Sequence, residues 1–141
     1  MKSKNWINRQ KNDQFVIKSK QKGFLSRSAF KLIEIETKFN FIKYSKKIID
    51  LGAAPGGWCQ VIFQFNPNAN VTAVDSLNLK FFHSNIDFIK KDFTKIDFKY
   101  LNKKYDLILS DLAPNTTGHQ STDHLRLSNI VNNVIENLNF I

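Results

Sequence analysis

Four aspartates stand where short apolar runs of the sequence end. Each run has the length of a β-strand, and the acidic residues at or near the ends are Asp50, Asp75, Asp92 and Asp111. If the runs are parallel strands of one sheet, their carboxyl ends meet at the edge where open α/β sheets bind ligands. In a chain with a formal net charge of +9, this acidic edge suits a cationic ligand.

The first of these aspartates begins a turn rich in small residues, Asp50–Trp58, with the sequence DLGAAPGGW. Gly52 and Gly56 allow backbone angles closed to other residues and let a ligand lie against the main chain. A phosphate-binding loop requires Lys and Ser or Thr after its last glycine, whereas Trp58 and Cys59 follow here. The G-x-G-x-x-G spacing of dinucleotide folds also fits poorly. The remaining common ligand of such a turn is S-adenosylmethionine, which needs no phosphate cradle.

The next two aspartates match two parts of a nucleoside. Asp75 lies 23 residues after Gly52, the distance at which nucleoside-binding α/β folds place a carboxylate on the ribose. A carboxylate accepts hydrogen bonds from both vicinal hydroxyls. Asp92, at the end of the third run, is able to accept a hydrogen bond from the adenine amino group. We therefore predict a nucleoside site at these strand ends.

Hydrophobic periodicity predicts the elements that position these residues. Nearly continuous apolar runs indicate buried parallel strands, and helical spacing indicates the segments between them. Strands are expected at 47–51, 71–75, 87–92 and 105–111, and helices at 13–20, about 26–36, 57–65 and 123–138. This alternation is typical of an α/β fold. At 141 residues we expect one domain, 13–141, preceded by a basic flexible arm at 1–12.

Capping residues and apolar stripes indicate the starts and faces of the helices. The predicted N-caps are Asp13, Ser26 and Asp123. The residues spaced to share one face of the second helix are Phe30, Ile33 and Thr37. Lys31 stands beside that stripe, and its spacing alone indicates an ordinary solvated lysine.

The charge balance indicates a polyanionic partner. Lys and Arg total 21 against 12 Asp and Glu, and the sequence pI is about 9.7. Lys outnumbers Arg 18 to 3, so A/T-rich codon usage is an alternative source of part of this charge. The charge is uneven, however, because the first 47 residues hold 13 Lys and Arg and three acidic residues. We therefore favour nucleic acid as the partner.

The remaining composition argues against several classes of protein. One cysteine leaves no disulfide framework within the chain and fits a reducing cytoplasm. No apolar run approaches the length of a membrane span, and the N-terminus lacks the apolar core of a signal peptide. The three histidines and the cysteine show no metal-ligand spacing. We expect a cytoplasmic protein without a membrane segment or a bound metal.

Together these motifs resemble the FtsJ/RrmJ family of RNA ribose 2′-O-methyltransferases. The resemblance runs from about Asp13 to the last residue. It rests on Ser26–Leu32 (SRSAFKL), Asp50–Trp58, Asp75, Asp92–Phe93 and Ser110–Asn115 (SDLAPN). With its short N-terminus and no extra domain, the chain is most similar to the bacterial branch, which acts on a uridine of large-subunit (23S) ribosomal RNA.

The resemblance implies a Rossmann-like methyltransferase fold with the sheet order 3-2-1-4 and S-adenosyl-L-methionine as cofactor. Gly56 and Trp58 would line the cofactor at the first turn. Asp75 would hold its ribose, and Asp92 would face its adenine. Asp111 would lie near the methionine end and the methyl group.

The resemblance also implies a catalytic pair. Lys31 matches the first lysine of the family's Lys–Asp–Lys–Glu catalytic set, and Asp111 matches its aspartate. Methyl transfer is an in-line displacement, so positioning of the ribose oxygen against the methyl carbon supplies much of the acceleration. A ribose 2′-hydroxyl is a weak acid, so a base or a nearby positive charge assists its attack.

The second lysine and the glutamate of that set have no counterpart in these 141 residues. We therefore expect a C-terminally truncated member that binds the cofactor and is impaired in catalysis. Two alternatives stay open. One is a non-catalytic RNA-binding remnant of the same fold, and the other is a methyltransferase for a small molecule or a protein.

Overall fold

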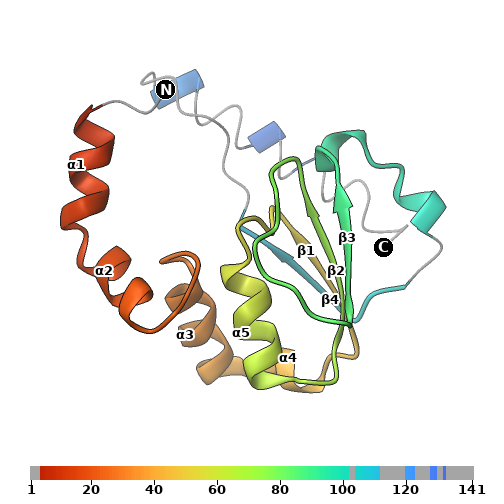
Figure 1. Ribbon diagram of the computed structural model, residues 1–141. Helices are drawn as coiled ribbons and strands as arrows, with labels where there is room; N and C mark the ends of the chain where they lie inside the picture. Colours follow the sequence, from red (N-terminus) through yellow and green to blue (C-terminus); the bar gives the residue numbers. More distant parts are fainter. Residues whose placement is uncertain (1–3, 102–103, 112–119, 123–127, 130–131, 133–141) are drawn as a thin grey trace.

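A computed structural model describes residues 4–101, 104–111, 120–122, 128–129 and 132. Its described strands form one parallel sheet in the order β3-β2-β1-β4, as predicted (Figure 1). The strands are β1 (Lys47–Leu51), β2 (Asn70–Asp75), β3 (Ile86–Lys90) and β4 (Leu107–Ser110). The α-helices are α1 (Lys4–Asn12), α2 (Gln14–Gln21), α3 (Ala29–Phe39), α4 (Phe41–Tyr44) and α5 (Gly57–Phe65). Two short 3-10 helices are η1 (Phe93–Lys95) and η2 (Phe98–Leu101).

Strand β1 lies between β2 and β4 and aligns their carboxyl ends. Its last residue, Leu51, stands opposite Val74 in β2 and Ser110 in β4. Every residue of β1 after Lys47 is buried. A strand covered on both faces is expected to be nearly continuously apolar, as this one is. The register therefore brings the residues that follow β1, β2 and β4 to one edge of the sheet.

Alternate residues of β1 face two separate apolar clusters. Ile48 belongs to the larger cluster, which contains residues of α3, α4 and α5. Ile49 and Leu51 belong to a smaller cluster, which includes Phe93 of η1 and Phe98 of η2. Figure 1 shows the three α-helices and the 3-10 helices on opposite sides of the sheet.

The predicted strands are confirmed, with shifts at their ends. β1 and α5 have the predicted bounds, and β2 begins one residue earlier than expected. β3 ends at Lys90 because Asp92 instead caps η1, where its Oδ1 accepts the N–H of Thr94 at 3.0 Å. β4 is shorter than predicted, and Asp111 directly follows it.

Helix α3 begins later than predicted and buries a different face. Ser28 occupies the N-cap position in place of Ser26, and its side chain caps no main-chain N–H. The hydroxyls of Ser26 and Ser28 instead hydrogen-bond each other at 2.8 Å. The buried face comprises Ala29, Leu32 and Glu36, whereas the predicted face is only half-buried at Phe30 and Ile33 and exposed at Thr37.

Glu36 takes this buried position because main-chain donors satisfy its carboxylate. Oε2 accepts the N–H of Ile42 at 2.8 Å, and Oε1 accepts the N–H of Lys43 at 3.2 Å. A buried carboxylate is costly unless it is hydrogen-bonded in this way. Glu36 therefore joins α3 to α4.

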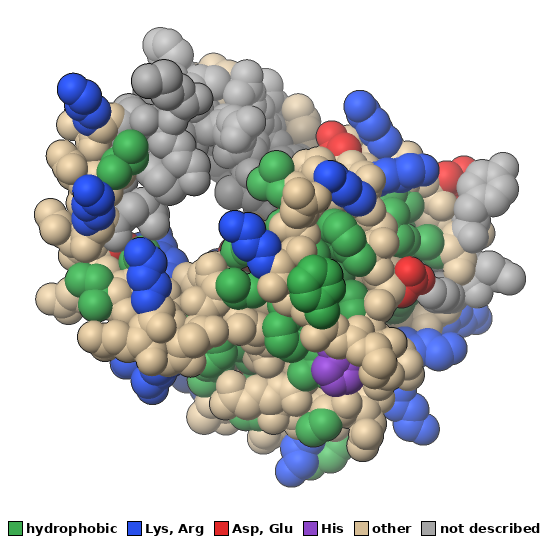
Figure 2. All heavy atoms as spheres, in the orientation of Figure 1, with side chains coloured by type: hydrophobic (Ala, Val, Ile, Leu, Met, Phe, Trp, Pro, Cys, Tyr) green, Lys and Arg blue, Asp and Glu red, His purple; other side chains and the backbone are tan. Residues whose placement is uncertain are grey.

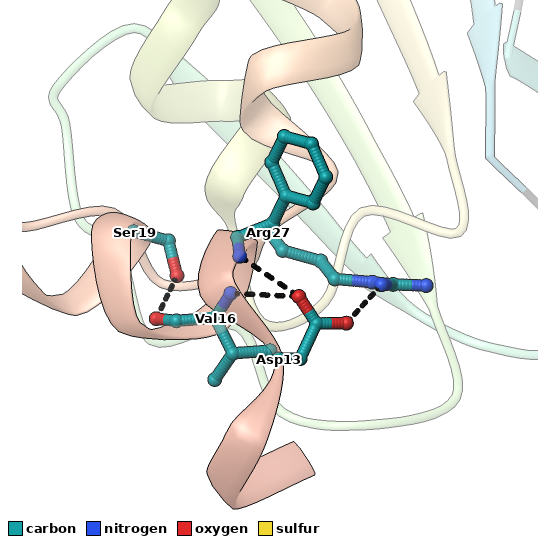
Figure 3. A network of polar contacts seen from close by, with 5 residues as sticks. Asp13, Val16, Ser19 and Arg27 are labelled. Carbon is teal, nitrogen blue, oxygen red and sulfur yellow. Dashed lines mark hydrogen bonds and ion pairs between the residues drawn. The ribbon is translucent and has the colours of Figure 1, made fainter. Parts of the chain in front are cut away.

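Asp13 caps α2, as predicted. Its carboxylate accepts the N–H groups of Phe15 at 2.8 Å and Val16 at 3.3 Å, and it pairs with Arg27 (Figure 3). This ion pair ties α2 to the turn before α3. Residues 4–12, where we expected a flexible arm, form helix α1.

The predicted helix at 123–138 and its cap Asp123 lie largely outside the described residues, as does Leu112–Asn115. Of the helices that the structure describes, none has the length and apolar character needed to cross a membrane.

Candidate cofactor and catalytic site

The turn after β1 is held by main-chain donors to β2. Gly52 has a φ of +85°, in the region that favours glycine. The N–H groups of Gly52 and Ala53 donate to the carbonyl of Val74 at 2.8 and 3.1 Å. The N–H of Ala54 donates to Asp75 Oδ2 at 2.9 Å. The conformation of the turn is therefore fixed by the chain itself.

Gly56 is required by its backbone angle and by close packing. Its φ is +125°, which is accessible to glycine and strained for other residues. A Cβ at this position would lie 2.8 Å from the Cβ of Phe81 and 3.3 Å from Cδ1 of Leu25. We expected bare main chain facing a ligand, but side chains of the chain itself fill this direction. A contact between Gly56 and a cofactor stays a prediction.

Asp75 organises the main chain on both sides of it. Besides the N–H of Ala54, it accepts the N–H of Leu77, through Oδ1 at 2.9 Å. A carboxylate offers about four acceptor positions, and these two hydrogen bonds use half of them. The remaining positions suit the vicinal hydroxyls of a ribose.

Asp50 is the most enclosed carboxylate of the site, with 1% of its surface exposed. The thiol of Cys59 in α5 donates to Oδ2 at 3.6 Å, and Oδ1 has no hydrogen-bond partner among the described residues. Burial raises the pKa of Asp50 to about 7; the Cys59 hydrogen bond opposes this rise, and the negative charges of Asp111 and Asp75 add to it. Burial, followed by the charge of Asp50, also raises the pKa of the Cys59 thiol. The thiol therefore stays protonated and acts as the donor.

Lys31 and Asp111 come together although 80 positions separate them in the sequence. Lys31 Nζ, on α3, lies 3.4 Å from Asp111 Oδ1, directly after β4. The side chains are 64% and 34% exposed, respectively. An ion pair this exposed contributes little to folding stability. The pair lies at the same sheet edge as the turn between β1 and α5, which we call the glycine turn.

Trp58 connects the glycine turn to the start of α3. Its indole is buried, and Nε1–H donates to the carbonyl of Ser28 at 3.0 Å. Gly57 also packs closely against the segment before α3, because an added Cβ at this position would overlap the Ser26 hydroxyl. These contacts hold the start of α3, the helix that carries Lys31. No pattern in the sequence predicts this positioning role. A cofactor contact of Trp58 stays a prediction.

Asp92 is exposed and stands apart from the other carboxylates. It accepts the N–H of Thr94 at 3.0 Å and its hydroxyl at 2.7 Å. These two hydrogen bonds hold the pKa of Asp92 below its usual value. Both hydrogen bonds are local to η1, and the adenine role of Asp92 stays a prediction.

The structure thus gathers three of the four strand-end carboxylates around one turn, with Lys31 beside them. The three are Asp50, Asp75 and Asp111. The sequence analysis places Asp50 at this acidic edge but assigns it no specific contact, although an acidic residue inside the buried run KIIDL was a visible signal. Within the described ranges, no group of His, Cys, Asp and Glu suits a metal ion.

Residues 24–139 match the family described as FtsJ-like methyltransferase. The chain belongs to this family. The match covers every predicted site residue, from Lys31 on α3 to Asp111 after β4. The family membership accounts for the sheet order and for the turn between β1 and α5.

Two relatives are named ribosomal RNA large subunit methyltransferase E. The relative from Rickettsia africae is 41% identical over 135 residues, covering 88% of this chain and 59% of the relative. The relative from Novosphingobium aromaticivorans is 40% identical over 138 residues, covering 95% of this chain and 62% of the relative. The chain therefore spans about three fifths of the length of these relatives.

A solved structure from Plasmodium falciparum, described as a ribosomal RNA methyltransferase, is also similar. It superposes with a TM-score of 0.69 at 32% identity, covering 79% of this chain and 69% of the other. The similarity supports the family assignment at the level of the fold.

Proposed function

We propose that this chain binds S-adenosyl-L-methionine at the carboxyl edge of β1, β2 and β4 and methylates a ribose 2′-hydroxyl of RNA. The names of the relatives support large-subunit ribosomal RNA as the substrate. A uridine as the target is what the resemblance to the bacterial branch implies. The net charge of +9 supports an RNA partner, because phosphate contacts by Lys and Arg supply much of RNA affinity. The reaction would take place in the cytoplasm.

The observation that carries the proposal is the concentration of negative charge at one turn. The negative charges of Asp111 and Asp75 lie close enough to the buried carboxyl group of Asp50 to raise its pKa. Asp50 Oδ1 has no hydrogen-bond partner among the described residues. A cation in this turn would be attracted by the charges of Asp75 and Asp111 and would favour the ionised form of Asp50. S-adenosylmethionine carries a positive sulfonium and an ammonium group, so the residues present fit this ligand.

When bound, the cofactor supplies a methyl group on a positively charged sulfur. Asp75 would hold the ribose through the acceptor positions that Ala54 and Leu77 leave. Lys31, held by Asp111, would place a positive charge beside the attacking oxygen and stabilise the charge that develops there. By holding both reactants, the site would supply the positioning that dominates such a displacement.

Asp75→Ala tests cofactor binding, with Asp106→Ala as a matched control. Both carboxylates accept two main-chain N–H groups, Asp75 at 2.9 and 2.9 Å and Asp106 from Lys46 and Lys47 at 2.8 and 2.9 Å. Asp106 lies at the opposite edge of the sheet, where β1 and β4 begin. Asp75→Ala should lower folding stability by about 1–3 kcal/mol through its lost hydrogen bonds. Asp106→Ala should also lower stability.

Calorimetric titration with S-adenosylmethionine then separates the two variants. We expect at least about tenfold weaker binding for Asp75→Ala, since each 1.4 kcal/mol changes affinity tenfold. Binding by Asp106→Ala should be unchanged, and unchanged binding by Asp75→Ala would refute the proposed site.

Methyl transfer requires a separate test, because the chain spans about three fifths of its relatives' length. We expect labelled cofactor to transfer methyl groups to undermethylated large ribosomal subunits. Robust transfer would refute the impairment expected from the missing second lysine and show that this lysine is dispensable. Salt-sensitive RNA binding without cofactor affinity would instead indicate an RNA-binding module. Transfer to a small molecule or protein, and not to RNA, would indicate a different substrate class.

A further inference from the structure

A hollow beside the Lys31–Asp111 pair combines aromatic, basic and acidic side chains. It has a volume of about 380 Å³ and is lined by Phe15, Arg27, Ser28, Phe30, Lys31, Glu34 and Asp111. Sites for small organic groups span about 300–1,000 Å³ and place a few polar groups among apolar walls. The hollow therefore has the size and composition of a site for one nucleoside-sized group.

Phenylalanines form the apolar wall of this hollow. The rings of Phe15 and Phe30 lie 6.5 Å apart and are tilted by 49°. Phe24 packs edge-on against Phe30 at 5.6 Å, and Lys18 Nζ lies 5.3 Å from the centre of the Phe30 ring. Phe30 is thus supported by its neighbours, whereas Phe15 is 58% exposed. The exposed ring is available for stacking.

The hollow continues toward a basic surface. The charged residues of α1 and α2 are all basic, namely Lys4, Arg9, Lys11, Lys18 and Lys20. Figure 2 shows Lys and Arg side chains along the outer side of these helices, at the left of the view. A second, more open hollow of about 630 Å³, lined by residues of both helices, shares Phe15 with the first. The Asp13–Arg27 ion pair fixes α2 to the turn before α3.

We propose that the hollow receives one unpaired base of the RNA, stacked on Phe15 and Phe30, so that its ribose lies against Lys31 and Asp111. This inference rests on the proposed function, because it assigns the place of the ribose that is methylated. Unpaired RNA bases are recognised by stacking on aromatic rings beside basic side chains. The bases of a duplex are stacked inside the helix and cannot enter. Glu34 supplies an acceptor for the N–H groups of the base.

Phe15→Ala tests this stacking surface without removing a buried side chain. Binding of a short single-stranded oligouridine and of a blunt RNA duplex is measured by fluorescence anisotropy at one salt concentration. We expect Phe15→Ala to bind the oligouridine about tenfold more weakly, equivalent to about 1.4 kcal/mol. Phe15→Trp, which keeps a stacking ring, should retain the affinity. Phe39→Ala is the matched control, because Phe39 is 70% exposed at the C-terminal end of α3 and does not line the hollow.

The proposal requires a loss that is specific to Phe15 and to single-stranded RNA. It is overturned if the unaltered chain does not bind the oligouridine, or if Phe15→Ala binds it normally. An equal loss for the duplex, or for Phe39→Ala, also overturns it.

Calorimetry with S-adenosylmethionine in the same variants separates this inference from the proposed function. Phe15→Ala should bind the cofactor like the unaltered chain. Phe15-dependent RNA binding in a chain that binds no cofactor would refute the proposed function and support the stacking site. Cofactor binding with Phe15-independent RNA binding would refute the stacking site and leave the proposed function supported.

Discussion

The glycine turn and the Lys31–Asp111 pair lie at the same edge of the sheet but are held in opposite ways. Main-chain hydrogen bonds to Val74 and Asp75 fix the turn, and the carboxylate of Asp50 beneath it is buried. The pair consists of two partly exposed side chains joined by one contact of 3.4 Å. The half proposed to bind cofactor is therefore preorganised, whereas the half proposed to meet RNA depends on flexible side chains.

This difference predicts how the two regions respond to substitution. Buried polar groups are costly to disturb, because few alternative partners are within reach. Exposed ion pairs are exchanged for water at little cost. Changes in the turn should therefore alter folding stability and cofactor affinity together, and changes at Lys31 should alter the reaction alone.

The buried carboxylate gives the largest expected effect. The pKa of Asp50 is about 7 in the folded chain against an ordinary value of 3.8. At a pH between these two pKa values, Asp50 is ionised in the unfolded chain and protonated in the folded chain. Folding stability should therefore fall by up to roughly 4 kcal/mol as the pH rises from about 4 to about 7, and then level off. Asp50→Asn should remove this fall, as measured by chemical denaturation at a series of pH values.

Two other carboxylates do not interfere in that pH window. Hydrogen bonds from Thr94 lower the pKa of Asp92, and hydrogen bonds from Lys47 and Lys46 lower that of Asp106. Their stabilising contributions are lost only as the pH falls below the ordinary value. An unchanged pH profile in Asp50→Asn would therefore contradict the assignment to Asp50.

Proton release gives a second measure of the same carboxylate. A cation beside Asp50 favours its ionised form, so binding of the cofactor below pH 7 should release a proton. The release appears as a dependence of the calorimetric heat on the buffer. Asp50→Asn should show none of it.

Gly56→Ala should have the next largest effect, with Gly23→Ala as its control. Gly23 also has a positive φ, +77°, but an added Cβ there meets nothing within 4 Å. Gly23→Ala should therefore carry only the backbone cost of about 1–2 kcal/mol. Gly56→Ala adds the clash with Phe81, and overpacking typically costs about 1–3 kcal/mol more. Urea denaturation measures the difference in free energy of unfolding between the two variants. Equal losses of stability would show that the segment containing Phe81 shifts to make room for the added Cβ.

The parts of this site that were predictable come from local signals. β1 and α5 have their predicted bounds because a continuous apolar run, a glycine-rich turn and a helical stripe follow one another directly. The strand-end positions of Asp75 and Asp111 follow from the same runs.

The parts that were missed depend on contacts between distant segments. Glu36 is buried because α4 supplies its donors, and Trp58 is oriented by a carbonyl at Ser28. Asp92 leaves the strand because the Thr94 hydroxyl and N–H offer it a local cap. No periodicity in the sequence records these partners.

Lys31→Gln should have the smallest effect on stability and the clearest effect on the reaction, with Lys38→Gln as its matched control. Both lysines are on α3, are 64% and 67% exposed, and face one carboxylate each, at 3.4 and 3.6 Å. Neither substitution should change the free energy of unfolding by more than about 0.5 kcal/mol, or alter cofactor affinity. Lys31→Gln should lower the rate of methyl transfer to undermethylated ribosomal subunits by at least about 100-fold, because it removes the charge beside the attacking oxygen. Lys38→Gln should leave that rate unchanged. Weaker cofactor binding in Lys31→Gln would contradict the separation, since it would make Lys31 part of the preorganised turn.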